Sequence, residues 1–305
     1  MDEVNRADTY AVIDVGTNNI LCLIARKRNH QLAILHRASS ISALGKNMQK
    51  GNLTHAAIYR TKVILNDYID YIKFFTDNII IIGTSCSREA KNINILSTWL
   101  SQKHGLHYHI ISGEEEAYYN GLANIYEFKG HKRFLLFDVG GGSTEFTLIS
   151  NNRIDKFQSI KLGIRRLQNK YGNSLNKKVQ FIRQSLEQLE LRSDILIGIG
   201  GTVTTLAAIN HGLEKYDPNI VHKSNISAEA LDIIIKRIRS LSHRQISRII
   251  PFDPFRSDII TLGALIIKEI IDKQEAANFY VSDRGLQFGI LQQEIKTLKK
   301  YLPDN

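Results

Sequence analysis

Apolar runs that end in short glycine turns occur twice along the chain, in the same order. Tyr10 to Ala25 holds two such runs joined by Asp14-Val15-Gly16, a pattern that predicts a β-hairpin. Gln31 to Leu44 predicts a third strand after it. Phe134 to Gly163 repeats the pattern around Asp138-Val139-Gly140. Each half of the chain is therefore predicted to open with a three-stranded meander.

A strand, a turn and a helix are predicted to follow in each half. Asn78 to Gly83 is an apolar run that leads into Thr84-Ser85, with a helix expected to open near Ser87. Asp194 to Gly201 is the matching run, and Thr202 and another helix come after it. Apolar residues at helical spacing also predict five longer helices. These are Thr54–Phe75, Ser174–Leu191, Ser227–Ser240, Arg256–Lys273 and Asp283–Tyr301.

This mixture of strands and crossover helices predicts an α/β fold, duplicated into two lobes. No linker rich in proline or glycine separates the halves, so the hinge is expected around Gly113 to Gly130. We expect one lobe over residues 1–122 and the other over residues 123–289. The last helix, over residues 290–305, is a candidate to return to the first lobe.

The net charge favours an anionic partner. Lysine and arginine total 40 against 30 acidic residues, which gives +10. Nucleic acid, nucleotides, polyphosphate and an acidic membrane surface all fit such an excess. The sequence has no basic tail and no interleaving of arginine with aromatic residues, so no nucleic-acid partner is expected. Small clusters such as Arg165-Arg166 are expected to be solvated faces, and a homodimer stays open.

Three further features point to a cytoplasmic protein. The longest apolar stretch, Ile259 to Ile267, is about half of the ~18 residues that a membrane span needs, so no membrane partner is expected. The chain starts Met1-Asp2-Glu3 with no apolar segment behind it, so no signal peptide is expected. Two cysteines, Cys22 and Cys86, cannot form a disulfide framework or a zinc site alone.

Three glycine turns fit the needs of a phosphate group, which requires backbone N–H groups with no side chain in the way. The candidate phosphate-binding residues in them are Gly16, Thr17, Asn18, Gly140, Gly141, Gly142, Ser143, Gly200, Gly201 and Thr202. The alternative for any one of them is an ordinary tight turn. The P-loop and dinucleotide fingerprints are both absent from the sequence.

Acidic residues stand beside two of these turns. Asp14 and Asp138 each end an apolar strand, and a carboxylate beside a phosphate is repulsive unless a cation lies between them. Oxygen ligands of this kind suit Mg²⁺. Glu145, on the strand that leaves the second turn, would face the same cavity as Asp138, or else be an exposed strand residue. These three acids are the candidate metal ligands.

The segment around Ser112 and an arginine upstream complete the candidate site. Ser112 and Glu115 have the spacing of a capping box at the start of a helix. Glu116 would act as a general base on water if its side chain points into a cleft between the lobes, and is otherwise a first-turn residue favoured by the helix dipole. Arg88 is the candidate phosphate clamp, because its guanidinium binds phosphate with two donors; the alternative is a solvated helix arginine.

Taken together and in order, these motifs resemble those of the exopolyphosphatase / guanosine pentaphosphate phosphohydrolase family. The matching segments are Asp14 to Asn18, Gly83 to Asn92, Ile111 to Ala117, Asp138 to Glu145, Gly200 to Thr202, Arg256 to Ile260 and Gly285-Leu286. Each motif is weak alone, but the ordered set is highly specific and extends over essentially the whole chain.

The resemblance implies a fold and an activity. The family has the duplicated actin-like, sugar-kinase-like (ribonuclease H-like) fold with a cleft between two lobes, and this chain is similar to its short form. Members use Mg²⁺ to remove the terminal phosphate from inorganic polyphosphate, from guanosine pentaphosphate, or from both. Glu116 matches the catalytic glutamate, Asp138 and Glu145 match acidic residues linked to metal and water, and Arg88 with the glycine turns matches the phosphate contacts.

Departures from the family pattern concern the choice of substrate. Tyr118 and Tyr119 stand where the family often has an arginine, and Asn19 stands where a small hydroxyl residue is common. Gln287 and Phe288 replace an Arg-Glu pair near the end. The acid set is intact, so hydrolysis is expected. The alternatives are a non-catalytic binder of alarmones or polyphosphate, which the residues at 287 and 288 would suit, and an ATP-dependent phosphotransferase on the same fold.

Overall fold

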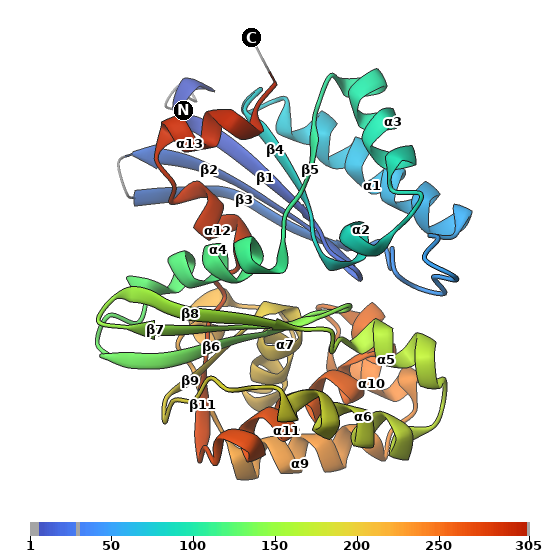
Figure 1. Cartoon of the computed structure of the whole chain (residues 1–305), viewed down its shortest axis with the longest axis vertical. Helices are drawn as coiled ribbons and strands as arrows, with labels where there is room; N and C mark the ends of the chain where they lie inside the picture. Colours follow the sequence, from blue (N-terminus) through green and yellow to red (C-terminus); the bar gives the residue numbers. More distant parts are fainter. Residues whose placement is uncertain (1–5, 29–30, 304–305) are drawn as a thin grey trace. The chain divides into compact units, whose positions relative to one another are not determined.

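The computed structural model describes residues 6–28 and 31–303 (Figure 1). The acidic start Met1-Asp2-Glu3 lies outside the described residues. The chain divides into two compact units. The first unit comprises Met1–Tyr119 and Leu286–Asn305, and the second comprises Asn120–Gly285. The first boundary therefore falls inside helix α4 (Gly113–Ile125).

The first unit contains a five-stranded mixed sheet in the order β3-β2-β1-β4-β5 (Figure 1). The strands are β1 (Thr9–Val15), β2 (Asn19–Arg28), β3 (Gln31–Ile41), β4 (Ile79–Gly83) and β5 (Tyr108–Ile110). The first three form the predicted antiparallel meander, and β4 and β5 add to it in parallel. The strand predicted to run to Leu44 ends earlier, at Ile41.

The second unit repeats this topology in a six-stranded sheet, β10-β11-β9-β6-β7-β8. Its strands are β6 (Arg133–Val139), β7 (Thr144–Ser150), β8 (Arg153–Ile160), β9 (Leu196–Ile199), β10 (Asn225–Ser227) and β11 (Asn278–Val281). Again three antiparallel strands are extended by parallel ones, β9 and β11, and β10 is an additional edge strand. The predicted duplicated α/β fold is confirmed.

Strand register places the glycine turns at the carboxyl edges of both sheets. Asp14 is opposite Ile82 in the parallel pair β1–β4, and Asp138 is opposite Ile199 in the pair β6–β9. Residues that follow β1 and β4 are therefore neighbours in the first unit, as are those that follow β6 and β9 in the second. By this register Thr84 corresponds to Gly201. The sequence pattern instead pairs Thr84 with Thr202, which is one residue further along the chain.

Helices cover the sheets and build the cores. The helices of the first unit are η1 (Arg6–Asp8), α1 (His55–Ile72), α2 (Ser85–Glu89), α3 (Asn94–His104), α12 (Leu286–Leu291), α13 (Ile295–Leu298) and η3 (Lys299–Tyr301), with the start of α4. Thr54 caps α1 by accepting a hydrogen bond from the N–H of Ala57. Side chains of α1 and α3 pack with alternate residues of β1 and β2, including Ile13 and Cys22, in one buried cluster.

The second unit has a larger helical layer. Its helices are α5 (Ile164–Tyr171), α6 (Leu175–Glu187), α7 (Gly200–Asn210), α8 (Pro218–Val221), α9 (Ala228–Arg239), α10 (His243–Ile249), η2 (Pro254–Asp258) and α11 (Ile260–Gln274), with the end of α4. Phe137 and Phe146 lie in the cluster formed with α5, α6, α7, α9 and α11. Leu136 and Ile149, on the opposite face, pack with Phe128, which follows α4. Asp138 is two positions after Leu136 on β6, so its side chain is on this second face of the sheet.

The prediction of a single helix over Asp283–Tyr301 is wrong. The segment is divided into α12, α13 and η3, and α13 begins after Glu294, whose backbone is extended (φ −60°, ψ 148°). The Lys27 ammonium donates to the Leu291 carbonyl over 2.6 Å and so occupies the end of α12. Periodicity read along the segment could not show this contact, because Lys27 lies on β2.

No helix in the described ranges has the length and apolarity that a bilayer crossing requires. Cys22 and Cys86 are both buried, and neither forms a disulfide in the part of the chain that the structure describes. Burial raises the pKa of the Cys22 thiol to about 12, so this thiol is neutral.

Candidate functional site

The first glycine turn is clamped by the chain that returns from β3. The Gly16 N–H donates to the Asn19 carbonyl over 2.9 Å, which closes the turn. Ala43 N–H donates to the Asn18 carbonyl (2.8 Å) and Gly45 N–H donates to the Thr17 carbonyl (2.9 Å). Thr17 and Asn18 are each only 7% exposed. The turn is thus a fixed part of the first unit.

The second turn has the same construction. The Gly140 N–H donates to the Ser143 carbonyl over 3.0 Å, as in the first turn. The chain returning from β8 clamps it: Arg165 N–H donates to the Gly141 carbonyl (2.8 Å), and the Arg166 Nε donates to the Gly142 carbonyl (2.6 Å). The closing bond and one backbone clamp are the same in both turns, while the bond to Gly142 comes from a side chain and the matching bond to Asn18 from a backbone N–H, so the duplication extends to the turns in most of its bonds.

The third turn opens helix α7 and touches the second. Gly200 has a positive φ of +82°, and a Cβ on it would collide with the Asp138 carboxylate, so only glycine fits here. Thr202 is 3% exposed, and its hydroxyl donates to the Val139 carbonyl at 3.4 Å. The backbone N–H of Thr202, not its hydroxyl, is therefore the group suited to an anion.

Asp138 and Glu145 are brought directly opposite each other. They are cross-strand partners in the β6–β7 register, so their side chains share one face of the sheet. Glu145 is 3% exposed, which excludes the exposed-residue alternative, and it accepts from the Ser159 hydroxyl at 2.9 Å. Asn120 Nδ2 donates to Asp138 at 3.4 Å.

The predicted magnesium site depends on this pair of carboxylates. Like charges opposite each other are destabilising, so two carboxylates here favour a bound cation. Within residues 6–28 and 31–303, no group of three or more His, Cys, Asp or Glu side chains could hold a metal ion. Two carboxylates suit Mg²⁺, which keeps several waters and takes further oxygens from phosphate groups. Asp14, at the end of β1 in the first unit, stays a predicted ligand.

Arg88 and Glu116 are in contact in the first unit. Arg88 lies on α2, just after the carboxyl end of β4, and its Nη1 donates to Glu116 Oε2 and to the Ile111 carbonyl, both at 2.9 Å. The Glu116 side chain is 12% exposed and that of Arg88 23%. Burial raises the pKa of the Glu116 carboxyl, and the Arg88 charge opposes this only in part.

The neighbouring glutamates have other roles. Ser112 N–H donates to Glu115 Oε2 (2.8 Å) and Glu115 N–H donates to the Ser112 hydroxyl (3.0 Å), which confirms the predicted capping box. Glu114 is exposed. Of the three successive glutamates, Glu116 alone is bonded to the candidate phosphate clamp.

Arg256 also lies beside the third turn, although the sequence motifs assign it no role. Its side chain is buried, its Nε donates to Asp253 at 2.7 Å, and a Cβ on Gly201 would lie 2.5 Å from its Nη2 and 2.7 Å from its Nη1. The guanidinium therefore lies against the first turn of α7. A helix N-terminus carries a partial positive charge, so a second cation here favours an anion. The Arg-x-Asp spacing of Arg256 and Asp258 was the available signal.

Arg165 also differs from expectation. It is not on a solvated face: it is 4% exposed and bound to Asp258. Its backbone N–H donates to the Gly141 carbonyl, and its buried side chain extends from there to Asp258. The residues that depart from the family pattern lie mostly inside: Tyr119 is buried and hydrogen-bonded to Tyr301 (2.6 Å), and Gln287 is 6% exposed, while Tyr118 is 40% exposed.

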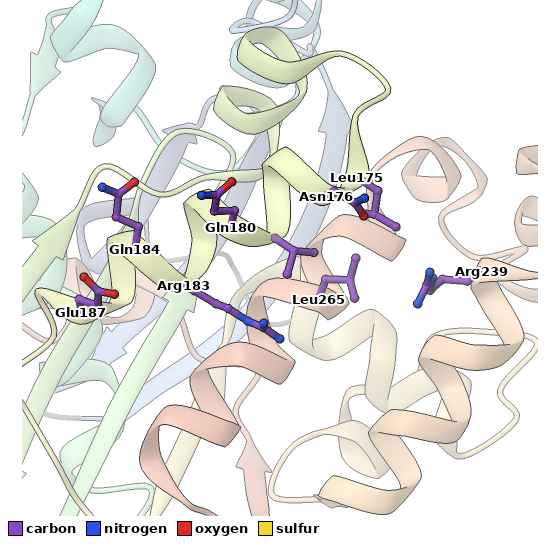
Figure 2. A pocket seen from close by; sticks show the side chains of 9 residues that line it. Leu175, Asn176, Gln180, Arg183, Gln184, Glu187, Arg239 and Leu265 are labelled. Atoms are coloured by element: carbon purple, nitrogen blue, oxygen red, sulfur yellow. The ribbon is translucent and has the colours of Figure 1, made fainter.

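A separate groove of about 670 Å³ lies among α6, α9 and α11 of the second unit. Figure 2 shows Arg183 and Arg239 beside it, with Leu265 between them. Arg183 is already bound at two points to Glu269. No predicted site residue lines this groove, so the candidate site is not this hollow but the glycine turns and their carboxylates.

Comparisons with known proteins identify relatives of this chain. The chain is 31% identical over 289 residues to a bifunctional 3-dehydroquinate synthase/phosphatase of Fusobacterium nucleatum, covering 86% of this chain and 43% of that protein. It is 28% identical over 285 residues to Exopolyphosphatase 2 of Mycobacterium tuberculosis, covering 85% of this chain and 89% of the relative. It thus spans less than half of the first relative and most of the second.

The fold also matches a solved structure. The PPX-GPPA enzyme of Aquifex aeolicus superposes with a TM-score of 0.78 at 26% identity, covering 94% of this chain and 99% of that one. The model of the Ppx/GppA phosphatase family matches residues 23–298. The expected family and the expected class of enzyme, a hydrolase, are confirmed by these matches, and the chain belongs to the Ppx/GppA phosphatase family.

Proposed function

We propose that this chain removes the terminal phosphate from inorganic polyphosphate or from guanosine pentaphosphate by attack of water. The observation that carries the proposal is the contact of Arg88 with Glu116, which joins a phosphate-binding cation to a buried base at 2.9 Å. The resemblance of the motifs implies both substrates. The name of the Mycobacterium tuberculosis relative, an exopolyphosphatase, supports the first.

Phosphate binding is assigned to rigid backbone and to arginine. The turns at Gly16 and Gly140 have the same closed geometry, and α7 begins directly at Gly200. The N–H groups of Gly16 and Gly140 are bonded within their turns, so the later N–H groups of each turn and those at the start of α7 are the ones suited to the charged, densely packed oxygens of a phosphate chain. Arg88 and Arg256 each stand beside such a turn or strand end and supply positive charge. Because these groups are already held by the fold, little ordering is needed when the substrate binds.

Glu116 is assigned as the general base. Its raised pKa makes the carboxylate a stronger proton acceptor than an ordinary surface glutamate. It takes a proton from the attacking water, whose oxygen forms a bond to the terminal phosphorus as the bridging P–O bond breaks. The electron pair of that bond leaves with the shortened substrate. Arg88 both orients Glu116 and keeps a share of the carboxylate ionised.

Asp138 and Glu145, with Asp14 as a further candidate, would hold Mg²⁺. When bound, the ion neutralises the part of the phosphate charge that the arginines of the protein do not balance. Asn120 and Ser159 keep the two carboxylates in place through hydrogen bonds of 3.4 and 2.9 Å.

The test is release of phosphate from polyphosphate and from guanosine pentaphosphate, measured side by side with and without Mg²⁺. We expect release from at least one of them, and loss of release when Mg²⁺ is chelated. Tight binding without release would instead indicate a non-catalytic binder. Consumption of ATP that requires a small acceptor would indicate a phosphotransferase. Either result would reject the proposed hydrolysis.

A further inference from the structure

We propose that Arg165 is a positioning residue of the phosphate site in the second unit, and that it acts through Arg256. The inference rests on the proposed function, because Arg256 must contact phosphate for its position to matter. It goes beyond that function because Arg165 belongs to none of the glycine turns, acidic residues or phosphate-binding arginines described above.

Arg165 is committed to the protein rather than to a ligand. Its side chain is 4% exposed, and its guanidinium donates at two points to Asp258, with Nη1 to Oδ2 at 2.7 Å and Nη2 to Oδ1 at 3.2 Å. Its backbone N–H also donates to the Gly141 carbonyl over 2.8 Å. One residue therefore connects the second glycine turn to η2. Planar two-point pairing of this kind fixes direction as well as distance.

The partner, Asp258, holds the short helix that carries Arg256. Asp258 is two residues beyond Arg256 in η2. The other end of η2 is fixed by Asp253, whose carboxylate accepts from the Arg256 Nε at 2.7 Å and whose carbonyl accepts from the Arg256 N–H at 3.1 Å. Arg256 thus sits between two anchors, one of which is the contact with Arg165.

Electrostatics explains why Arg256 needs such anchors. Its guanidinium lies against Gly201, in the first turn of α7, where the helix dipole is also positive. Before an anion binds, these charges repel, and an unanchored arginine would swing away. The pair formed by Arg165 and Asp258 resists this movement. It keeps the arginine in the conformation that a phosphate requires, so less has to be ordered on binding.

The experiment is a double-substitution cycle read out by binding of inorganic tripolyphosphate, measured by titration calorimetry in the presence of Mg²⁺. We expect Arg165→Met to weaken binding by about 10- to 100-fold, the range that a displaced binding group produces. In a chain that already carries Arg256→Met, the same substitution should change binding by less than about twofold, because its effect passes through the missing arginine.

Arg183→Met is the matched control. Arg183 makes a two-point pair with Glu269, both contacts at 2.9 Å, elsewhere in the second unit. Its loss should leave tripolyphosphate binding unchanged. If Arg165→Met does not fold, Arg165→Lys replaces it, since lysine keeps the charge but cannot form the two-point pair. We expect it to weaken binding in the same direction, and again only when Arg256 is present.

Two results with the variants would overturn the proposal. Losses that multiply independently in the double variant would show that Arg165 acts directly or through stability alone. Unchanged binding in a folded Arg165→Met or Arg165→Lys protein would show that it positions nothing. Failure of the proposed function is recognised separately: wild-type protein that binds tripolyphosphate but releases no phosphate rejects hydrolysis and leaves the cycle readable. Wild-type protein that does not bind overturns both.

Discussion

Three successive glutamates at the start of α4 show how far single residues can be interpreted from sequence. The spacing of Ser112 and Glu115 predicted a capping box, and both hydrogen bonds are present. No local pattern predicts the partner of Glu116, because Arg88 is 28 positions away and α3 and β5 lie between them along the chain. Local chemistry was therefore predictable, and a contact set by the tertiary fold was not.

Glu116→Gln tests the role of this carboxylate. The amide keeps the shape of the side chain and a hydrogen bond to Arg88 but cannot accept a proton at neutral pH. We expect kcat for phosphate release to fall by about 10²- to 10⁴-fold, the usual contribution of a general base, with KM little changed. Glu114→Gln, on an exposed neighbour, is the control and should retain full activity. Near-normal turnover in the Glu116 variant would reject its assignment.

Arg88→Met should move the acid limb of the pH profile. Burial raises the pKa of Glu116 above that of an ordinary glutamate, and Arg88 lowers it in part. The base form is required, so activity is lost as pH falls through this raised pKa. Removing Arg88 removes the lowering contribution, and the limb of log kcat at saturating substrate should shift to higher pH. Arg88→Lys should shift it less. A limb that stays in place would show that Arg88 does not tune the base.

At the scale of elements, strands were easier to predict than helix ends. Both meanders follow from apolar runs and Gly or Asn turns, because strand pairing is decided by neighbours in sequence. The prediction of one continuous last helix failed, and the Lys27 ammonium, which binds the Leu291 carbonyl where α12 ends, comes from another element that local periodicity does not include. The clamps on the two glycine turns are also tertiary contacts. The segment after β3 holds the first turn, and the segment after β8 holds the second. The sequence shows the turns but not what holds them.

Gly163→Ala tests the clamp on the second turn. The backbone at Gly163 is extended (φ −148°), so alanine can adopt it, but a Cβ there would collide with the backbone of Gly142. We expect the turn to shift, the free energy of unfolding to fall by about 1–3 kcal/mol as in other overpacked sites, and KM to rise. Gly130→Ala is the control, since a Cβ there meets nothing within 4 Å. Equal stability in urea for both variants would contradict the clamp.

At the scale of the whole molecule, the chain enters the second unit inside α4 and returns to the first at Leu286. The helical pattern of the sequence makes residues 290–305 only a candidate for such a return. Its basis is visible only in the structure: α12 contacts β1 and β2, Lys27 holds its last carbonyl, and Tyr301 bonds to Tyr119. A Cβ on Gly289 would overlap the Tyr119 carbonyl, so the glycine is required by close packing of α12 on α4.

Truncation after Gly285 should therefore unfold the first unit while sparing the second. All six residues of α12 are buried, and burying each large apolar side chain contributes about 1.5–3 kcal/mol, so the loss approaches the whole stability of a typical domain. Hydrogen exchange should show lost protection in β1 and β2 and retained protection in β6 and β9, whose sheet and helices lie within Asn120–Gly285. Truncation after Leu302 keeps α12, α13 and Tyr301, and should preserve protection in both sheets. Native protection of β1 without residues 286–305 would show that the returning segment is an accessory to the first unit and not part of its fold.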